Sequence, residues 1–173
     1  MAILPILKYP DARLRNISSP IVTFDEALAS LDQDMRETML NAPGSGLAAP
    51  QVNRLLRIIV IDDSAPDEDY GSRVLTLVNP KIVNAAGELV YREGCLSVLD
   101  LQAEVRRAEE VTVEAQDIAG QNFTITAKGR KAVILQHEID HLDGVLFVDR
   151  VSRLIKDMYL KKRRKFQKQA QNS

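Results

Sequence analysis

His137 and His141 are the only histidines in the sequence, and Glu138 directly follows the first of them. On an α-helix, side chains four positions apart lie on one face, separated by about 6 Å along the axis. Two neutral imidazoles on one face can provide two ligands of a divalent metal ion. The adjacent carboxylate can then act as general base on a water molecule held by that ion. This HExxH pattern therefore indicates a hydrolytic metal site.

Two other roles for the histidines compete with catalysis. A histidine on an apolar helix is often a hydrogen-bonded core residue, but this spacing with a glutamate in place is uncommon by chance. A structural metal site is closed by four protein ligands and usually contains several cysteines. The sequence has one cysteine, so an open, catalytic site is favoured.

The helix that carries the histidines is expected to begin near Gly129 and to be buried. Its sequence surrounds the histidines with apolar side chains, namely Ala132, Val133, Ile134, Leu135, Ile139 and Leu142. Apolar residues on most of the helix surface are typical of a helix inside a protein core.

A small-residue loop, Gly44–Gln51, follows the first predicted helix. Its glycines and alanines permit close approach by another backbone. The Lys-Ser/Thr ending of a phosphate-binding loop is absent, which argues against nucleotide binding. The side-chain amide of Gln51 is a neutral donor suited to a developing oxyanion.

The single cysteine, Cys95, lies in the segment Glu93-Gly94-Cys95-Leu96-Ser97. A buried cysteine is usually an inert apolar residue. Because the histidine pair lacks a third ligand, we expect the Cys95 thiolate to supply it.

With these three segments in this order, the sequence resembles the peptide deformylases, metalloenzymes that remove the formyl group from nascent proteins. The resemblance rests on Gly44–Gln51, Glu93–Ser97 and Gln136–His141, and Tyr9–Arg15 is also similar to the family. It implies an enzyme that hydrolyses the N-formyl group of N-formylmethionine on nascent polypeptides and releases formate.

The resemblance also implies roles for individual residues. Cys95, His137 and His141 would bind one divalent metal ion per chain, with Fe²⁺ expected and Zn²⁺, Ni²⁺ or Co²⁺ possible. Glu138 would transfer protons, while Gln51 Nε2 and the Leu96 backbone N–H would stabilise the oxyanion. The expected substrate contacts are Gly44, Ser45, Gly46, Glu93, Gly94 and Val133, with Leu135 and His137 beside Val133 in the methionine pocket.

Three residues depart from the family pattern, namely Ser45, Leu99 and Arg130. Ser45 and Arg130 replace apolar residues, so we expect an altered preference beyond the first substrate residue. We also expect Glu93 to pair with Arg107 behind the site and to fix the Cys95 segment.

The composition predicts one α+β domain. The chain has 173 residues, 45% hydrophobic and 27% charged, which is typical of a globular protein. We expect antiparallel or mixed sheets around the central HExxH helix, with a helix near each terminus. Residues 1–150 would form the catalytic metal-binding domain, and residues 151–173 a basic helix of the same domain.

The other elements follow from local patterns. Thr23 and Glu26 predict a capping box that opens a helix, which ends near Asn41. Expected strands cover 57–61, 75–78 and 89–91, with a turn at 84–87, and a hairpin joins 111–117 to 122–127. Leu154, Ile155 and Met158 would anchor the last helix on the body.

Charge is distributed unevenly along the chain. Residues 151–173 hold eight basic residues and Asp157, a net charge of +7, whereas the other 150 residues carry 15 basic and 23 acidic groups. A basic tail on an acidic body suggests a polyanionic partner, although a merely solvated helix is the alternative. Related bacterial enzymes suggest the ribosome, with no role for DNA or a membrane.

One cysteine and the absence of a signal peptide favour the cytoplasm. Two other functions compete with deformylation. The first is a metallopeptidase, which shares HExxH but generally takes its third ligand from a downstream histidine or acid. The second is a catalytically silent protein that binds the ribosome, which would have no need of Glu138 or Gln51.

Overall fold

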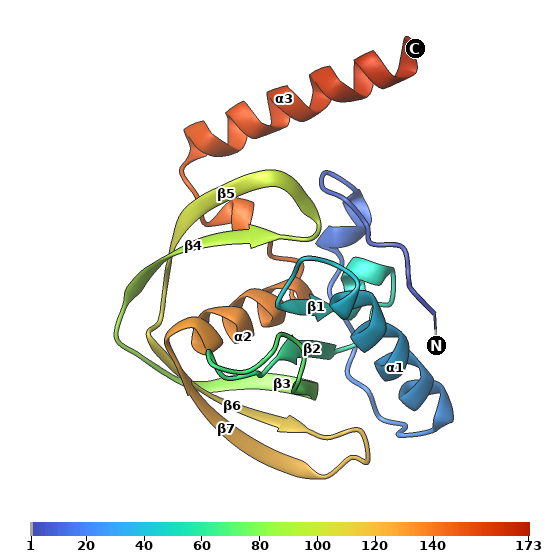
Figure 1. The fold of residues 1–173 in the computed structure, drawn as a ribbon, viewed down its shortest axis with the longest axis vertical. Coiled ribbons are helices and arrows are strands. Elements are labelled where there is room, and N and C mark those ends of the chain that lie inside the picture. The colour runs from blue at the N-terminus through green and yellow to red at the C-terminus, as the bar shows by residue number, and fades with distance from the viewer. Residues whose placement is uncertain (1) are drawn as a thin grey trace.

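The computed structural model describes residues 2–173 and places α2 (Gly129–Leu142) between two antiparallel sheets (Figure 1). The larger sheet has the order β1-β2-β3-β6-β7, with β1 (Gly46–Ala48), β2 (Ile58–Asp62), β3 (Val74–Ala86), β6 (Glu110–Gln116) and β7 (Asn122–Lys128). The smaller sheet pairs β4 (Leu89–Cys95) with β5 (Val98–Arg107). The α+β class is therefore confirmed.

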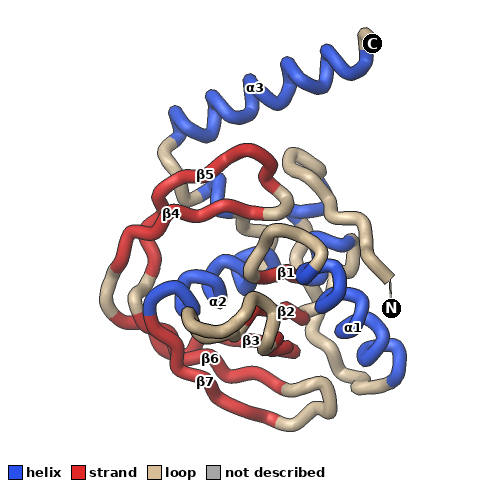
Figure 2. The backbone as a smooth tube through the Cα atoms, viewed as in Figure 1, coloured by secondary structure: helices blue, strands red, loops and turns tan. Residues whose placement is uncertain are grey.

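Helices complete the fold at both ends of the chain (Figure 2). They are α1 (Glu26–Leu40) and α3 (Arg153–Gln171), with 3₁₀ turns at Ala12–Arg15, Ala49–Val52 and Phe147–Asp149. No helix within residues 2–173 is both long and apolar enough to cross a membrane.

The core is layered around β2, whose side chains alternate between two faces. Ile59 and Ile61 pack in one apolar cluster with the inner side of α2. Ile58 and Val60 pack in a second cluster, which includes Met35 of α1. The placement of α2 follows from this burial, because Ala132, Leu135, Ile139 and Leu142 all lie in the first cluster.

The start of α1 differs from the prediction. The helix begins at Glu26, and the cap is Asp25, whose side chain accepts a hydrogen bond from Leu28 N at 3.0 Å. The predicted capping box of Thr23 with Glu26 is wrong. Asp25 satisfies a free N–H of the first turn, that of Leu28, and its carboxylate also interacts favourably with the positive helix end.

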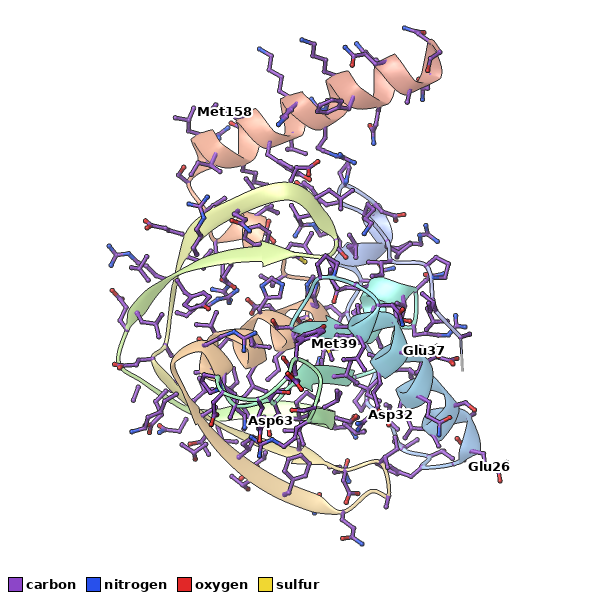
Figure 3. The ribbon with its side chains drawn as sticks, viewed as in Figure 1. Glu26, Asp32, Glu37, Met39, Asp63 and Met158 are labelled. Carbon is purple, nitrogen blue, oxygen red and sulfur yellow. The ribbon has the colours of Figure 1, made fainter. Side chains whose placement is uncertain are left out.

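The predicted anchoring of α3 is also wrong. Leu154 and Met158 are 69% and 63% exposed, Ile155 is also exposed, and Met158 projects from the helix into solvent (Figure 3). The contact is made instead by Tyr159, which is buried, stacks on Tyr9 and donates a hydrogen bond to the Leu99 carbonyl at 2.8 Å. Beyond this point α3 extends away from the body (Figure 1).

Three differences concern strands. The 84–87 segment was expected to be a turn, but β3 continues to Ala86, and β3 and β4 belong to different sheets. β1 and β5 were not predicted. The hairpin of β6 and β7 is confirmed by its register, which runs from Glu110 opposite Lys128 to Gln116 opposite Asn122.

Candidate metal centre and active site

The structure brings Cys95, His137 and His141 together from β4 and α2. Their ligand atoms lie within 4.8 Å of one another, the group that the described residues offer for a metal ion. The Nε2 atoms of the two histidines are 3.3 Å apart, and Cys95 Sγ is 3.4 Å from His141 Nε2. The four-residue spacing on α2 places both imidazoles on one face, and Cys95 at the end of β4 places its sulfur beside them.

These separations suit a four-coordinate ion. Tetrahedral bonds of about 2.1 Å to nitrogen and 2.3 Å to sulfur would separate the donor atoms by roughly 3.4–3.6 Å. The observed 3.3 and 3.4 Å lie close to that range. Cys95, His137 and His141 could therefore hold a divalent metal with little rearrangement, and a fourth position would remain for a non-protein ligand.

Glu93 orients His137 from behind. Its Oε1 lies 3.0 Å from His137 Nδ1, which leaves Nε2 to face the other two donor atoms. Arg107 donates to both oxygens of Glu93, at 2.9 and 3.0 Å, and donates to Asp140 at 2.6 Å. The Glu93–Arg107 contact expected from the sequence is thus present. Such a carboxylate behind a histidine ligand fixes the ring and its tautomer.

The electrostatics of the cluster favour a cation. Burial alone would lower the pKa of His137, but the negative charges of Cys95, Glu93 and Glu138 raise that pKa well above its usual range. Burial, assisted by the positive charges of His137 and Arg107, lowers the pKa of His141 well below its usual range. The surroundings of His137 thus stabilise positive charge, which a bound metal ion would also provide. His141 stays a neutral imidazole, the form that coordinates a metal.

Glu138 is enclosed beside the cluster. Burial raises the pKa of this carboxyl to about 7, and its Oε2 has no hydrogen-bond partner among residues 2–173. Gly46 makes this enclosure possible, because a Cβ atom on it would lie 2.6 Å from Glu138 Oε1. A carboxyl group with a pKa near neutrality and an unused oxygen is suited to accept and return a proton.

One of the two predicted oxyanion donors, the side-chain amide of Gln51, lies beside Cys95. Gln51 is fixed by its Oε1, which accepts from Ala48 N at 2.8 Å, while its Nε2 donates to Ser97 Oγ at 3.1 Å and lies 3.7 Å from Cys95 Sγ. The Leu96 carbonyl accepts from Lys8 Nζ at 2.6 Å. The Gln51 amide is therefore held at the sulfur, within reach of a group bound there.

A cavity of about 960 Å³ opens over these groups. All of the predicted catalytic residues and substrate contacts line it, namely Gln51, Leu96, Glu138, Gly44, Ser45, Gly46, Glu93, Gly94 and Val133. His137 and Cys95 lie in its wall, whereas His141 is buried behind them. Leu135, which was expected in the methionine pocket, faces the core cluster of the large sheet, and Ile134 takes its place in the cavity wall.

The sequence did not indicate three further residues of this site. Ser97 contacts the Gln51 amide, Asp140 is the second acidic partner of Arg107, and Lys8 reaches the Leu96 carbonyl. Asp140 lies inside the HExxH segment, so its position three residues after His137 could have suggested a supporting role. Lys8 has no signal in the sequence, because the contact spans 88 positions.

A buried carboxyl beside three converging ligand atoms, open to a cavity of peptide size, is the arrangement of a hydrolase. Comparison with known proteins gives the family. The sequence model of the polypeptide deformylase family matches residues 3–157. A peptide deformylase of Desulfotalea psychrophila is 46% identical over 166 residues, covering 96% of this chain and 98% of the relative. One of Chromobacterium violaceum is 47% identical over 169 residues, covering 98% and 99%.

Solved structures agree with the sequence comparison. The crystal structure of a peptide deformylase from Legionella pneumophila superposes with a TM-score of 0.89 at 46% identity, covering 99% of each chain. The chain belongs to the polypeptide deformylase family. It is accordingly a hydrolase that removes the formyl group from nascent peptides.

Proposed function

We propose that the protein releases formate from N-formylmethionine at the start of nascent polypeptides, with one divalent metal ion held by Cys95, His137 and His141. The observation that carries the proposal is the convergence of the three ligand atoms on the wall that also holds Glu138. Fe²⁺ is the ion expected, and the mixed thiolate and imidazole donors also suit Zn²⁺, Ni²⁺ or Co²⁺. When bound, the ion supplies a Lewis acid that acidifies water and polarises the formyl oxygen.

The residues of the chain supply the other steps. Glu138 accepts a proton from the attacking water and then gives it to the leaving nitrogen of methionine. Gln51 Nε2 and the Leu96 backbone N–H donate hydrogen bonds to the oxygen on which negative charge develops. Loss of one such donor typically costs about 3 kcal/mol in the barrier. This assignment agrees with the fixed Gln51 amide at 3.7 Å from Cys95 Sγ.

The substrate backbone binds along β1. This strand is the edge of the large sheet, so one of its sides is available for pairing with a peptide. Gly44, Ser45 and Gly46 line the cavity beside β1, and Glu93 and Gly94 of β4 also line it. Val133, Ile134 and His137 receive the methionine side chain.

The proposal includes a cytoplasmic location and a ribosomal partner. Residues 1–150 perform the chemistry, and residues 151–173 contact the ribosome through basic side chains. From Lys161 onward, no basic side chain of α3 forms an ion pair with another residue of the described chain. All of these basic residues except the partly buried Arg163 are exposed, so their charges are free to meet phosphate groups.

Formate release from formyl-Met-Ala-Ser by anaerobically purified protein tests the activity. We expect turnover by the wild type and a loss of about 10²–10⁴-fold in Glu138→Ala, whose metal content should be unchanged. Cleavage of unformylated Met-Ala-Ser would instead indicate a metallopeptidase. Ribosome binding without turnover of either peptide would indicate a silent binding protein.

A further inference from the structure

The rim of the cavity carries unpaired positive charge. Arg92 and Arg130 both line the cavity, and neither forms an ion pair with any residue between 2 and 173. Their hydrogen bonds go to neutral partners: Arg92 Nε donates to Gln102 Oε1 at 3.2 Å, and Arg130 Nη2 donates to Ser45 Oγ at 2.5 Å. Lys8 adds a third cation, and its Nζ likewise binds a neutral carbonyl.

Acidic groups do not cancel this charge at the rim. Of the acidic residues that line the cavity, Glu93 is buried and neutralised by Arg107, and Glu138 is enclosed beside the ligand cluster. Asp100 is the remaining acidic residue of the lining, and one carboxylate does not cancel the three cations Lys8, Arg92 and Arg130. Residues 1–150 carry 15 basic and 23 acidic groups, so the positive rim is opposite in sign to the net charge of the body.

Arg130 has a defined place along the peptide path. It lies one turn before Val133 and Ile134 on α2, about 10 Å along the helix axis from His137. An extended peptide covers this distance in about three residues. Its partner Ser45 directly precedes Gly46, the residue packed against Glu138, so we infer that the anchored guanidinium meets the peptide beyond the first substrate residue.

Most N–H donors of the Arg130 guanidinium are not used within the described chain. Arginine has five N–H groups in a planar fork that matches a carboxylate, and within residues 2–173 Arg130 uses one hydrogen bond, to Ser45. The Ser45 hydroxyl thus fixes the fork without neutralising it. An apolar residue at either position would leave the rim without this fixed charge.

We propose that the Ser45–Arg130 pair, together with Arg92 of the same cavity lining, makes this deformylase prefer nascent chains whose second or third residue is acidic. Arg130 is the specificity-determining residue, and it acts on the peptide after methionine and takes no part in the chemistry. The inference rests on the proposed deformylation, because the substrate must thread the cavity for its downstream residues to meet the rim.

The test compares kcat and KM on formyl-Met-Glu-Ala, formyl-Met-Gln-Ala and formyl-Met-Lys-Ala, and on the same set with the variable residue third. We expect kcat/KM for the best Glu peptide to exceed that for its Gln counterpart by about threefold, and that for the Lys counterpart by more. The difference should reside in KM and shrink in 0.5 M NaCl, where exposed charges are screened.

Two variants of Arg130 test whether this residue causes the preference for an acidic substrate residue. Arg130→Leu should abolish most of the preference for Glu over Gln without changing kcat on the Gln peptide, and Arg130→Lys should retain part of it. Arg106→Leu is the matched control, since Arg106 is a 76% exposed arginine outside this cavity, and it should keep the full preference.

Equal kcat/KM on the three peptides, or a preference that survives in Arg130→Leu, would overturn the selectivity while leaving deformylation intact. Absence of formate from every peptide, including formyl-Met-Ala-Ser, would overturn the proposed function and the selectivity together.

Discussion

Arg107 illustrates, at the scale of single residues, how the site depends on a charge that never meets the substrate. Its guanidinium is almost fully buried and contacts Glu93 and Asp140. Glu93 in turn holds His137, one of the proposed ligands. Although burial would raise the pKa of Glu93, the hydrogen bonds from His137 and Arg107 lower it, so the carboxylate stays charged behind the histidine.

Replacement of Arg107 by methionine should therefore damage both stability and metal binding. Leaving Glu93 buried without its partner should cost about 3–5 kcal/mol in the free energy of unfolding. Loss of the group that supports a ligand typically weakens metal affinity by about 10–100-fold. Urea unfolding and competition with a chelator measure the two effects.

The neighbouring Arg106→Met provides the control for this prediction. Arg106 lies on the same strand, but it is exposed, and within residues 2–173 its one ion pair is with Glu88. We expect little change in either measurement. If Arg107→Met kept wild-type metal affinity, Glu93 would have to position His137 without help from Arg107.

At the scale of elements, Asp149 joins three distant parts of the chain. It accepts hydrogen bonds from Arg15 at 2.5 and 3.0 Å, from Leu146 N at 2.9 Å and from Lys156 at 3.0 Å. It therefore ties the N-terminal 3₁₀ turn and the first turn of α3 to the loop after α2. Burial alone would raise the pKa of Asp149, but these hydrogen bonds lower it to about 2.

The sign of this shift predicts how stability depends on pH. A carboxyl group whose pKa is lower in the folded state stabilises the fold above its unfolded pKa near 4, and this contribution is lost as pH falls towards 2. Because Asp149 is partly exposed, its contribution should be about 1–2 kcal/mol. Asp149→Asn should thus reduce the free energy of unfolding at pH 6, and the gap to the wild type should narrow towards pH 3.

Urea titrations at several pH values test the prediction, with Asp157→Asn as control. Asp157 is exposed, and its one ion pair among the described residues is with Arg153 of its own helix, at 3.7 Å. A constant difference between Asp149→Asn and the wild type from pH 6 to pH 3 would show that the carboxylate charge is not the stabilising feature.

Elements with a strong local pattern were predicted well, and elements defined by distant partners were not. The apolar surroundings of His137 predicted α2, and alternation around the Gly120 turn predicted the β6–β7 hairpin. β5 was not predicted although its residues alternate, because its buried face includes the small Ala103 and the charged Arg107 and its sheet has only two strands. The cap of α1 was misplaced because Thr23 and Asp25 are both capping residues.

The same distinction applies to the site. The four-residue spacing of the two histidines is a local pattern in the sequence. Cys95 was predicted because two histidines alone lack a third metal ligand. Leu135 was misplaced by one position, since helical periodicity gives the apolar positions without showing which of them faces a cavity. The roles of Lys8 and Ser97 depend on contacts between segments far apart in the sequence, and no periodicity reports these.

At the scale of the whole molecule, α3 concentrates charge on a helix that extends away from the catalytic body (Figure 1). Its contact with the body lies in its first turns, at Tyr159 and Lys156. Removal of residues 161–173 would therefore keep that contact and remove six basic groups, namely Lys161, Lys162, Arg163, Arg164, Lys165 and Lys168.

Truncation after Leu160 should weaken binding to ribosomes by at least tenfold and leave kcat/KM on formyl-Met-Ala-Ser unchanged. The reason is that each basic group bound to a phosphate releases a counterion, so the slope of log affinity against log salt should fall by about 0.7–0.9 for each such group removed. Cosedimentation with ribosomes at several salt concentrations measures both quantities. A full-length variant with glutamine at Lys161, Lys162, Arg164 and Lys165 separates charge from helix length, and because it loses four of the six basic groups, it should show about two thirds of the change in salt slope. Ribosome binding that survives both changes would place the docking surface on the acidic body, where attraction to phosphate could not explain it.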